Sequence, residues 1–520
     1  MRLETPSFPA ITKNGPLFWI AKHLKGTVSS GILIPTVFFV VLSYYNILMY
    51  LSNYYTIFDL GLAYRTMYLF ITTHTFVNWP IPYALVTAKP YTKLIYVPLS
   101  LTLLIYRGPT TVLVDMIAAV SAGGYAIFRI FKIRTSSAKM GLMAQMMYFL
   151  YPATYGLMAH GGNFMIFFTP LLLLSFMYYL EEKHYKSGVF ALLSMLTFSF
   201  ATIVVPLFYL ITLIIDNRYI KKNLTNTKDP DNNGALSAIS RGTKRKYYFL
   251  LVIFAVGLIV FVYEASLYSL VGLVNAARIP TAGSGTAAST SGNSLFNTIF
   301  AVMPHMKWNF FFDMLYPVVF IPLLTPYAFF ILPFFLLVFY ANFFPYYSVS
   351  QQYPSMVNVF IFVGLAHFFH RHFRKAVVKK MAPFLLITSI YSFAMLSPFS
   401  IGNFEQGNIG YYSHVTPLDL ELNKGLSLIP LNSSVFIQND IPQLMDRATV
   451  YMPGYYENQS VEFAVIIPPN LGFPSDQYSG YTPYWANFFA HNTSYGIYEN
   501  IGGILIYKLH FYSNPVFTAS

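Results

Sequence analysis

Residues 28–53, VSSGILIPTVFFVVLSYYNILMYLSN, form an apolar run without a single charged side chain. About 20 apolar residues are enough for a helix to cross the hydrocarbon core of a bilayer. Comparable runs recur as far as Leu396, and they are too long for the strands of a soluble core. They also lack the period-two alternation of membrane β-barrel strands. The pattern predicts an all-α, multi-pass membrane bundle.

The residues before this first run do not read as a cleavable signal peptide. They carry Arg2, Lys13, Lys22 and Lys25, but no short apolar stretch with a small-residue cleavage site. We therefore expect the run at 28–53 to remain as a spanning helix. The chain has no cysteine, which excludes disulfides and thiolate metal sites.

Basic residues gather in a few short segments, although the net charge of the chain is +13. Cytoplasmic loops of membrane proteins carry such an excess of Lys and Arg. This pattern predicts a multi-pass protein of the plasma membrane with a cytoplasmic N-terminus, and it does not indicate nucleic-acid binding. The clusters are the N-terminus, Arg129–Lys139, Lys183 with Lys186, Arg218–Lys246 and Arg371–Lys380.

One alternating path through the membrane satisfies all of these clusters, with about eleven spans. In it, the run 187–216 divides into two short helices near Pro206, and the run 313–341 makes two passes with a turn at Thr325-Pro326. Tyr91–Tyr106 is too short to span and reads as interfacial or re-entrant. The predicted helices cover roughly residues 28–51, 109–131, 138–158, 163–181, 187–216, 247–274, 313–341, 354–370 and 381–397.

The C-terminal part has a different composition, with three basic and nine acidic residues in 402–520. We expect two domains: a transmembrane domain over 1–401 and a small α/β domain over 402–520, outside the cell. Strands are predicted at 434–438 and 462–467, with a helical turn at 441–447 between them, and a closing hairpin over 495–507. Three Asn-x-Ser/Thr sequons predict glycosylation at Asn432, Asn458 and Asn492.

Asp59 is the only acidic residue between Glu4 and Asp115, and it lies just past the first apolar run. A carboxylate at the membrane boundary can take a proton from a hydroxyl and so activate it for attack. Basic side chains in the same outer segment suit a phosphate group. Such an arrangement describes transfer from a phospholipid-linked donor. The alternative is that Asp59 caps a helix starting at Leu60. The basic residues are Arg65, Lys89, Lys93 and Arg107.

Other polar residues give weaker signals. Asp115 and Glu264 lie within spans, where pairing inside the bundle is the simpler reading. His160 and Asn163, at an outer turn, could supply a proton shuttle or a hydrogen bond. The histidines are scattered and the outer loops hold few carboxylates, so we predict no metal site and no cofactor.

Several short motifs resemble those of a family of archaeal and bacterial multi-pass membrane proteins, grouped with the type-C (GT-C) glycosyltransferases. The resemblance covers about residues 40–510, and the order of the motifs is more specific than any one of them. The motifs are Phe58-Asp59-Leu60-Gly61, Tyr151-Pro152, Tyr346-Tyr347-Ser348-Val349-Ser350, Leu428-Ile429-Pro430, Gln438-Asn439 and Asp446-Arg447.

The resemblance implies a helical bundle with an outer active-site cavity and a sugar donor carried on a polyprenyl phosphate. It matches Asp59 to the acidic residue of the first outer loop, and Lys89 and Lys93 to the part of that loop that meets the lipid phosphate. The implied reaction is transfer of the sugar to an acceptor outside the cell, in the cell envelope.

The sequence departs from this family at two places. The turn His160-Gly161-Gly162-Asn163 lacks the acid of the family's "Phe-His-Pro-Glu"-like turn, and Phe200-Ala201-Thr202 stands where an acidic cluster is common. A second hypothesis is therefore a catalytically inactive scaffold or anchor subunit of a larger membrane complex. A transporter of lipid-linked substrates is a third, but it needs an internal repeat that the sequence does not show.

Overall fold

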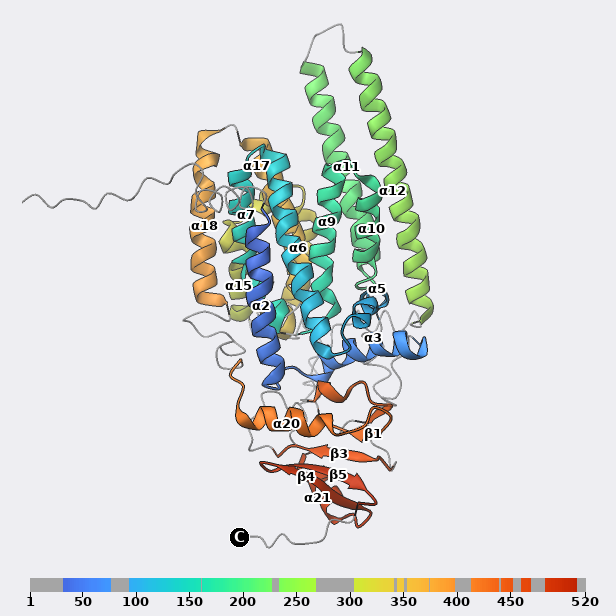
Figure 1. Cartoon of the computed structure of the whole chain (residues 1–520). Helices are drawn as coiled ribbons and strands as arrows, with labels where there is room; N and C mark the ends of the chain where they lie inside the picture. The colour runs from blue at the N-terminus through green and yellow to red at the C-terminus, as the bar shows by residue number, and fades with distance from the viewer. Residues whose placement is uncertain are drawn as a thin grey trace, which may run out of the picture.

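The structure is a computed structural model. It describes residues 31–75, 93–159, 161–226, 233–267, 304–340, 344–349, 353–373, 375–397, 413–438, 441–451, 460–468 and 482–511. Within these ranges the chain forms a helical bundle followed by a small C-terminal sheet (Figure 1).

The bundle contains the following described helices, in chain order. They are α2 (Leu33–Leu51), α3 (Leu62–Thr73), α5 (Tyr96–Ser100), α6 (Pro109–Thr135), α7 (Ala138–Phe149), α8 (Pro152–Ala159), α9 (Phe168–Leu180), α10 (His184–Met195), α11 (Ala201–Asn226), α12 (Asn233–Leu267), α15 (Pro304–Leu315), α16 (Ala328–Tyr340), α17 (Ser355–His372) and α18 (Ala376–Leu396).

Helix α6 lies at the centre of the bundle and packs against α2, α7, α9 and α17. Two adjacent glycines make this packing close. A Cβ on Gly124 would come within 2.1 Å of the Phe149 ring of α7, and one on Gly123 within 3.2 Å of Pro170 in α9. Small residues at helix contacts let backbones approach in the way that membrane bundles favour.

The span count of about eleven is too high for the part of the chain that the structure describes. By length and composition, four described helices could cross a membrane: Leu33–Leu51, Pro109–Thr135, Lys246–Tyr263 and Ala376–Leu396. Most other apolar runs are divided into shorter helices. The run at 138–158 breaks at Pro152 into α7 and α8, because proline offers no N–H to continue the helix.

The break within 187–216 is also displaced from its predicted place. It lies at Leu196–Phe200, between α10 and α11, and Pro206 is inside α11. Pro206 has no N–H to donate to Thr202 O, but the helix continues past this one missing bond. In the predicted interfacial segment Tyr91–Tyr106, the structure describes residues 93–106. They form α5 and a 3-10 turn at Leu101–Leu104, both too short to span, as predicted.

The run 313–341 does not form the two full passes predicted for it. Helix α15 begins before the run, at Pro304, and ends at Leu315, residues 316–327 form a turn, and α16 follows. Helices α15 and α16 have 12 and 13 residues, about 18–20 Å at 1.5 Å per residue, against about 30 Å of hydrocarbon. The turn spans 316–327 and is wider than the predicted Thr325-Pro326 turn. It lies against the middle of α17, where a Cβ on Gly364 would be 2.9 Å from Thr325 Oγ1.

The C-terminal domain contains α20 (Pro417–Ser427), β1 (Ser434–Phe436), β2 (Thr449–Tyr451), β3 (Phe463–Ile466), α21 (Thr482–His491), β4 (Tyr495–Ile501) and β5 (Ile504–Leu509). The strand order is β2-β1-β3-β5-β4. Strand β1 pairs parallel with β2 and β3, and the other pairs are antiparallel.

This sheet confirms the strands predicted at 434–438 and 462–467 and the closing hairpin. The helical turn predicted at 441–447 is present at Pro442–Leu444. Strand β2 and helices α20 and α21 were not predicted. The predicted domain boundary at 401/402 lies outside the described residues, as does Asn458; Asn432 is exposed and Asn492 is half-buried.

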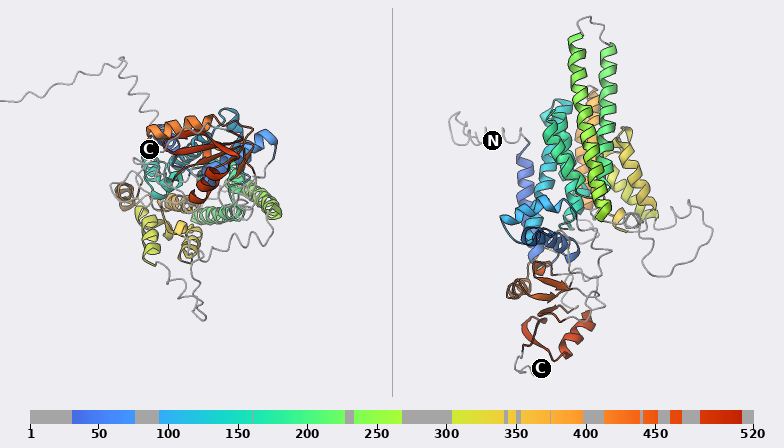
Figure 2. Two further views of the ribbon diagram at one scale, coloured as in Figure 1. Left: turned by 90° about the horizontal axis from the view of Figure 1, so that it is seen from below. Right: turned by 90° about the vertical axis from the view of Figure 1, so that its right-hand side faces the viewer.

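The C-terminal domain and the projecting hairpin of α11 and α12 lie at opposite ends of the bundle (Figures 1 and 2). The basic side chains of α6 and the start of the apolar segment of α12 lie at the hairpin end. Arg134 lies in the last turn of α6 there. Its carbonyl oxygen is 2.7 Å from the His370 ring of α17. Asp216 of α11 forms ion pairs with Arg134 and Lys246. Helix α3 lies across the other end, between the bundle and the C-terminal domain (Figure 1).

Candidate functional site

Asp59 lies in a single π-helical turn, Ile57–Gly61, between the end of α2 and the start of α3. The turn closes with a bond from Gly61 N to Thr56 O of 3.2 Å. Such turns occur frequently at functional sites. The N-cap residue of this turn is Thr56, and the N-cap residue of α3 is Gly61. Asp59 is therefore inside the turn and does not occupy the capping position of a helix at Leu60.

One side-chain amide holds the Asp59 carboxylate. Asn163 Nδ2 donates to Asp59 Oδ1 at 3.0 Å. The other end of the Asn163 amide accepts from Met165 N, also at 3.0 Å, at the start of the 3-10 turn Phe164–Phe167. That second bond fixes which end of the amide faces Asp59. Asn163 is buried, whereas Asp59 is only partly buried.

The turn before Asn163 packs directly on the backbone of the Asp59 segment. Gly162 has φ +92°, and a Cβ there would lie 2.9 Å from Leu60 Cα and 3.2 Å from Asp59 O. A Cβ on Gly161 would lie 2.6 Å from the Tyr55 ring. At position 162, only glycine fits both the left-handed backbone conformation and the close approach to Leu60. The segment Gly161–Asn163 thus fixes the position of Asp59.

The sequence hypothesis did not include two tyrosines: Tyr96, which contacts the same turn, and Tyr353, which interacts electrostatically with Asp59. Tyr96 of α5 is fully buried and donates its hydroxyl to Gly162 O at 2.9 Å. Burial, together with the Asp59 charge, raises the pKa of Tyr96 well above its ordinary value. Burial, Tyr346 and Asp59 also raise the pKa of Tyr353, whose ring centroid is 4.4 Å from that of Tyr346. Both phenols stay neutral and can donate hydrogen bonds at physiological pH.

Lys93 lies on the other side of the turn. Its side chain is buried, with Nζ 3.4 Å from Ser199 Oγ and 5.5 Å from the centroid of the Phe164 ring. The backbone next to it is held by a bond from Ile95 N to Leu196 O of 3.0 Å. Asp59 and Lys93 therefore contact adjacent residues of one turn, Asn163 and Phe164.

Arg65 has a different environment from the one the phosphate hypothesis requires. It is 1% exposed, and its guanidinium donates to the carbonyl oxygens of Met445 and Arg447 at 2.8 Å and of Ala448 at 3.3 Å. Burial lowers the pKa of Arg65 to about 10, and the nearby Asp446 acts in the opposite direction. The Arg65 side chain thus binds the main chain of the C-terminal domain.

Further bonds fasten the same domain to the end of α2. Asn53 donates to Asp419 Oδ1 at 2.9 Å and accepts from Gln443 Nε2 at 2.7 Å, while Asn423 donates to Leu51 O at 3.0 Å. A Cβ on Gly61 would lie 3.0 Å from Met445 Cγ. The Asp59 segment is thus held between the 161–163 turn and the 441–448 loop.

Among the remaining sequence-predicted residues, those that the structure describes form no hydrogen bond or ion pair with this turn. Arg107 is exposed just before α6, while Lys89 and His160 lie outside the described residues. Asp115 accepts from Thr102 Oγ1 at 2.6 Å within the bundle. In the described ranges no three His, Asp or Glu side chains gather as metal ligands would, and the metal-free site stays a prediction.

The residues missed from the sequence are Tyr96, Gly162, Ser199 and Tyr353. A signal existed for Gly162, in the Gly-Gly pair before Asn163, and for Tyr353, which follows the Tyr346–Ser350 motif. Nothing in the sequence marked Ser199.

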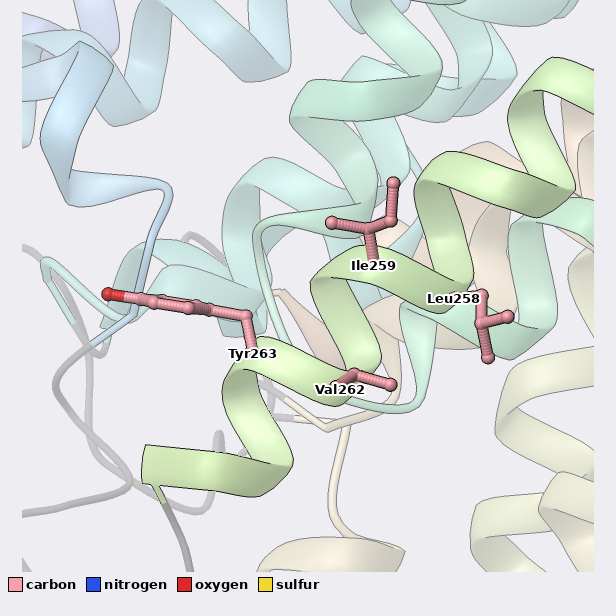
Figure 3. A pocket seen from close by; sticks show the side chains of 4 residues that line it. All are labelled: Leu258, Ile259, Val262 and Tyr263. Atoms are coloured by element: carbon pink, nitrogen blue, oxygen red, sulfur yellow. The ribbon is translucent and has the colours of Figure 1, made fainter.

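A hollow on the exposed face of α12, lined by Leu258, Ile259, Val262 and Tyr263, contains none of the site residues (Figure 3).

One comparison with known proteins identifies a relationship. A family model described as "Predicted membrane protein (DUF2079)" matches residues 54–477, which is most of the chain. The match begins just before the Asp59 turn and includes the 161–164 turn and the 441–448 loop. No curated protein matches the chain.

Proposed function

The chain belongs to the DUF2079 family of predicted membrane proteins, and on that premise we propose that it is a GT-C-like glycosyltransferase. It transfers a sugar from a polyprenyl-phosphate donor to an acceptor outside the cell. The observation that carries the proposal is that a partly exposed carboxylate, Asp59, and a buried cation, Lys93, contact adjacent residues of one turn, Asn163 and Phe164.

In the proposed reaction, Asp59 takes the proton of the acceptor hydroxyl as its oxygen attacks the anomeric carbon of the sugar. The bond between that carbon and the phosphate oxygen breaks, and the polyprenyl phosphate leaves with the bonding electrons. Attack from the side opposite the leaving group inverts the anomeric configuration. Lys93 stabilises the charge that develops on the phosphate.

Asn163 contributes by orientation. Its donated bond to Oδ1 holds the carboxylate in one direction, and the bond from Met165 N prevents the amide from turning. A general base acts only when it is placed within hydrogen-bond distance of the proton it removes. Arg65 is not part of this proposal, because its donors serve main-chain carbonyl oxygens.

The proposed orientation places the C-terminal domain outside the cell. The basic residues of α6, α12 and α17 lie at the end of the bundle opposite this domain. Because cytoplasmic ends carry the Lys and Arg excess, the Asp59 turn faces the exterior. Asn432 and Asn492 are then available for glycosylation.

The test replaces the native chain in its host cells by an Asp59→Asn variant and measures the glycan product and the lipid-linked sugar. A general base contributes about 10²–10⁴-fold to a rate, so we expect loss of the glycan product and accumulation of the lipid-linked sugar. Glu421→Gln, an exposed carboxylate on α20, is the matched control and should leave both pools unchanged. Normal glycan and lipid-linked sugar in the Asp59→Asn cells would exclude the catalytic role.

The second candidate is a catalytically inactive scaffold of a membrane complex. The bonds of Arg65 and Asn53 favour it, because they show that the Asp59 segment also seats the C-terminal domain. This candidate predicts a stoichiometric membrane partner in purified material, and unchanged lipid-linked sugars in the Asp59→Asn cells.

A further inference from the structure

The hairpin end of the bundle carries a group of lysines and tyrosines on two neighbouring helices. Lys183, Tyr185 and Lys186 stand at the start of α10, and Lys246, Tyr247 and Tyr248 on α12; we call these six residues the basic patch. Tyr185 is 85% exposed and Tyr248 72%. Lys183 and Lys186 are exposed as well.

Contacts among α9, α10 and α12 bring the three lysines of the patch to one helical turn. The His184 ring of α10 lies 5.7 Å from the Phe249 ring of α12. Lys183 and Lys186 place their ammonium groups 5.9 and 5.6 Å from the Tyr178 ring centroid, and Lys246 is 5.2 Å from the Tyr179 ring. All three cations therefore surround the last turn of α9.

The depth of the patch is set by α12. Its membrane-length apolar segment is Lys246–Tyr263, so Lys246, Tyr247 and Tyr248 stand where the hydrocarbon ends. Tyrosine is enriched at this level of a bilayer, and lysine at the headgroups beside it. Leu251 and Val252, one turn further along α12, are 68% and 56% exposed and form an apolar surface below the patch.

The charges near the patch do not cancel. Glu181 pairs with Arg129 and Lys183, and Asp216 pairs with Arg134 and Lys246; Glu182 is exposed. Lys186 forms no ion pair with any side chain in the described ranges. The sequence between Asp216 and Lys246 is also basic: it contains Arg218, Lys221, Lys222, Arg241, Lys244 and Arg245 against two acidic residues.

We propose that the basic patch binds the headgroup phosphate of an acidic phospholipid of the adjacent leaflet. The lysine ammonium groups donate to the phosphate oxygens, the tyrosines lie at the glycerol level, and the acyl chains run along Leu251 and Val252. A soluble phosphate would satisfy the lysines but would leave this apolar surface without a role. Clusters of basic residues beside a spanning helix recognise anionic headgroups in this way.

The experiment uses the full chain purified in neutral detergent and titrated with phosphatidylglycerol or phosphatidylcholine. Bound lipid is counted by native mass spectrometry, and the thermal unfolding midpoint is followed in parallel. We expect phosphatidylglycerol to remain bound and to raise the midpoint, and phosphatidylcholine to do neither. Each lysine near anionic lipid contributes ~1 kcal/mol, about fivefold in affinity. Lys183→Gln with Lys186→Gln should therefore weaken binding at least tenfold.

The matched control is Lys375→Gln with Lys380→Gln, which removes two exposed charges beside and on α18. Equal loss in both double variants would show a general attraction to the bundle end and would overturn the site. The same midpoint shift with glycerol phosphate would show that the ligand is a soluble phosphate. Because Lys183→Arg with Lys186→Arg keeps both charges, it should retain binding; loss there would also contradict the proposal.

Discussion

At the scale of single residues, Gly162 decides the geometry around Asp59. Its φ of +92° lies in the left-handed region, and Leu60 Cα occupies the space where a Cβ would be. Its carbonyl oxygen accepts from Tyr96. One glycine thus connects the Asp59 turn, the Asn163 amide and α5, although it carries no functional group.

The variant Gly162→Ala should lower stability by more than the backbone cost of ~1–3 kcal/mol, because the methyl group also displaces Leu60. Gly503→Ala separates the two effects: Gly503 has φ +98°, but nothing lies within 4 Å of its Cβ position. We expect a clearly larger drop in the thermal midpoint for Gly162→Ala. Equal drops would mean that the 161–163 turn does not press on the Asp59 segment.

At the scale of elements, α15 and α16 are each shorter than the hydrocarbon core, and the proline-rich turn between them packs inside the bundle. Thr388 Oγ1 of α18 donates to Pro317 O at 2.9 Å, and the Tyr327 hydroxyl lies 3.2 Å from Thr212 Oγ1 of α11. Irregular backbone at membrane depth is tolerated where protein groups satisfy it. Val319 and Phe320 also adopt positive φ in this turn.

A single cysteine in this turn tests its depth, since the chain contains no other cysteine. Leu324→Cys, at an exposed residue of the turn, should resist a membrane-impermeant maleimide from both sides of sealed vesicles and react after detergent is added. Tyr185→Cys and Tyr484→Cys, at opposite ends of the molecule, serve as controls and should react from the inside and the outside respectively. Labelling of Leu324→Cys from the inside would indicate two full spans.

At the scale of the whole molecule, the bundle and the C-terminal domain are joined at the segment that carries Asp59. Arg65 is the centre of this joint, with three carbonyl oxygens of the 445–448 loop around its guanidinium. The Tyr64 hydroxyl donates to Asp446 Oδ2 at 3.2 Å, and Asp446 pairs with Arg447. Movement of the C-terminal domain would therefore be transmitted to the Asp59 turn.

Replacing Arg65 by Met removes these donors and leaves buried carbonyl oxygens unsatisfied, at a cost of at least ~3 kcal/mol. We expect a lower thermal midpoint and faster proteolytic release of the C-terminal domain from intact membranes. Arg107→Met, which removes an exposed cation, should change neither. Wild-type protease resistance in Arg65→Met would show that other contacts hold the domains together.

The membrane class, the helical bundle and most strands of the C-terminal sheet followed from the sequence, because apolar length and strand patterning are local properties of the chain. Asp59 and Asn163 were also recognisable, since a lone carboxylate and a polar turn stand out in an apolar sequence. Their 3.0 Å hydrogen bond joins residues 104 positions apart, and no local pattern contains that distance.

The tertiary structure alone decided what Arg65 and Lys93 contact. Both are cations of the same predicted outer segment, and their charges made them equal candidates for a phosphate. Folding placed Arg65 against main-chain carbonyl oxygens of a loop 380 residues away, and Lys93 beside Phe164 and Ser199. The sequence determines the charge of a side chain, but the partner of a buried charge depends on which distant segments pack around it.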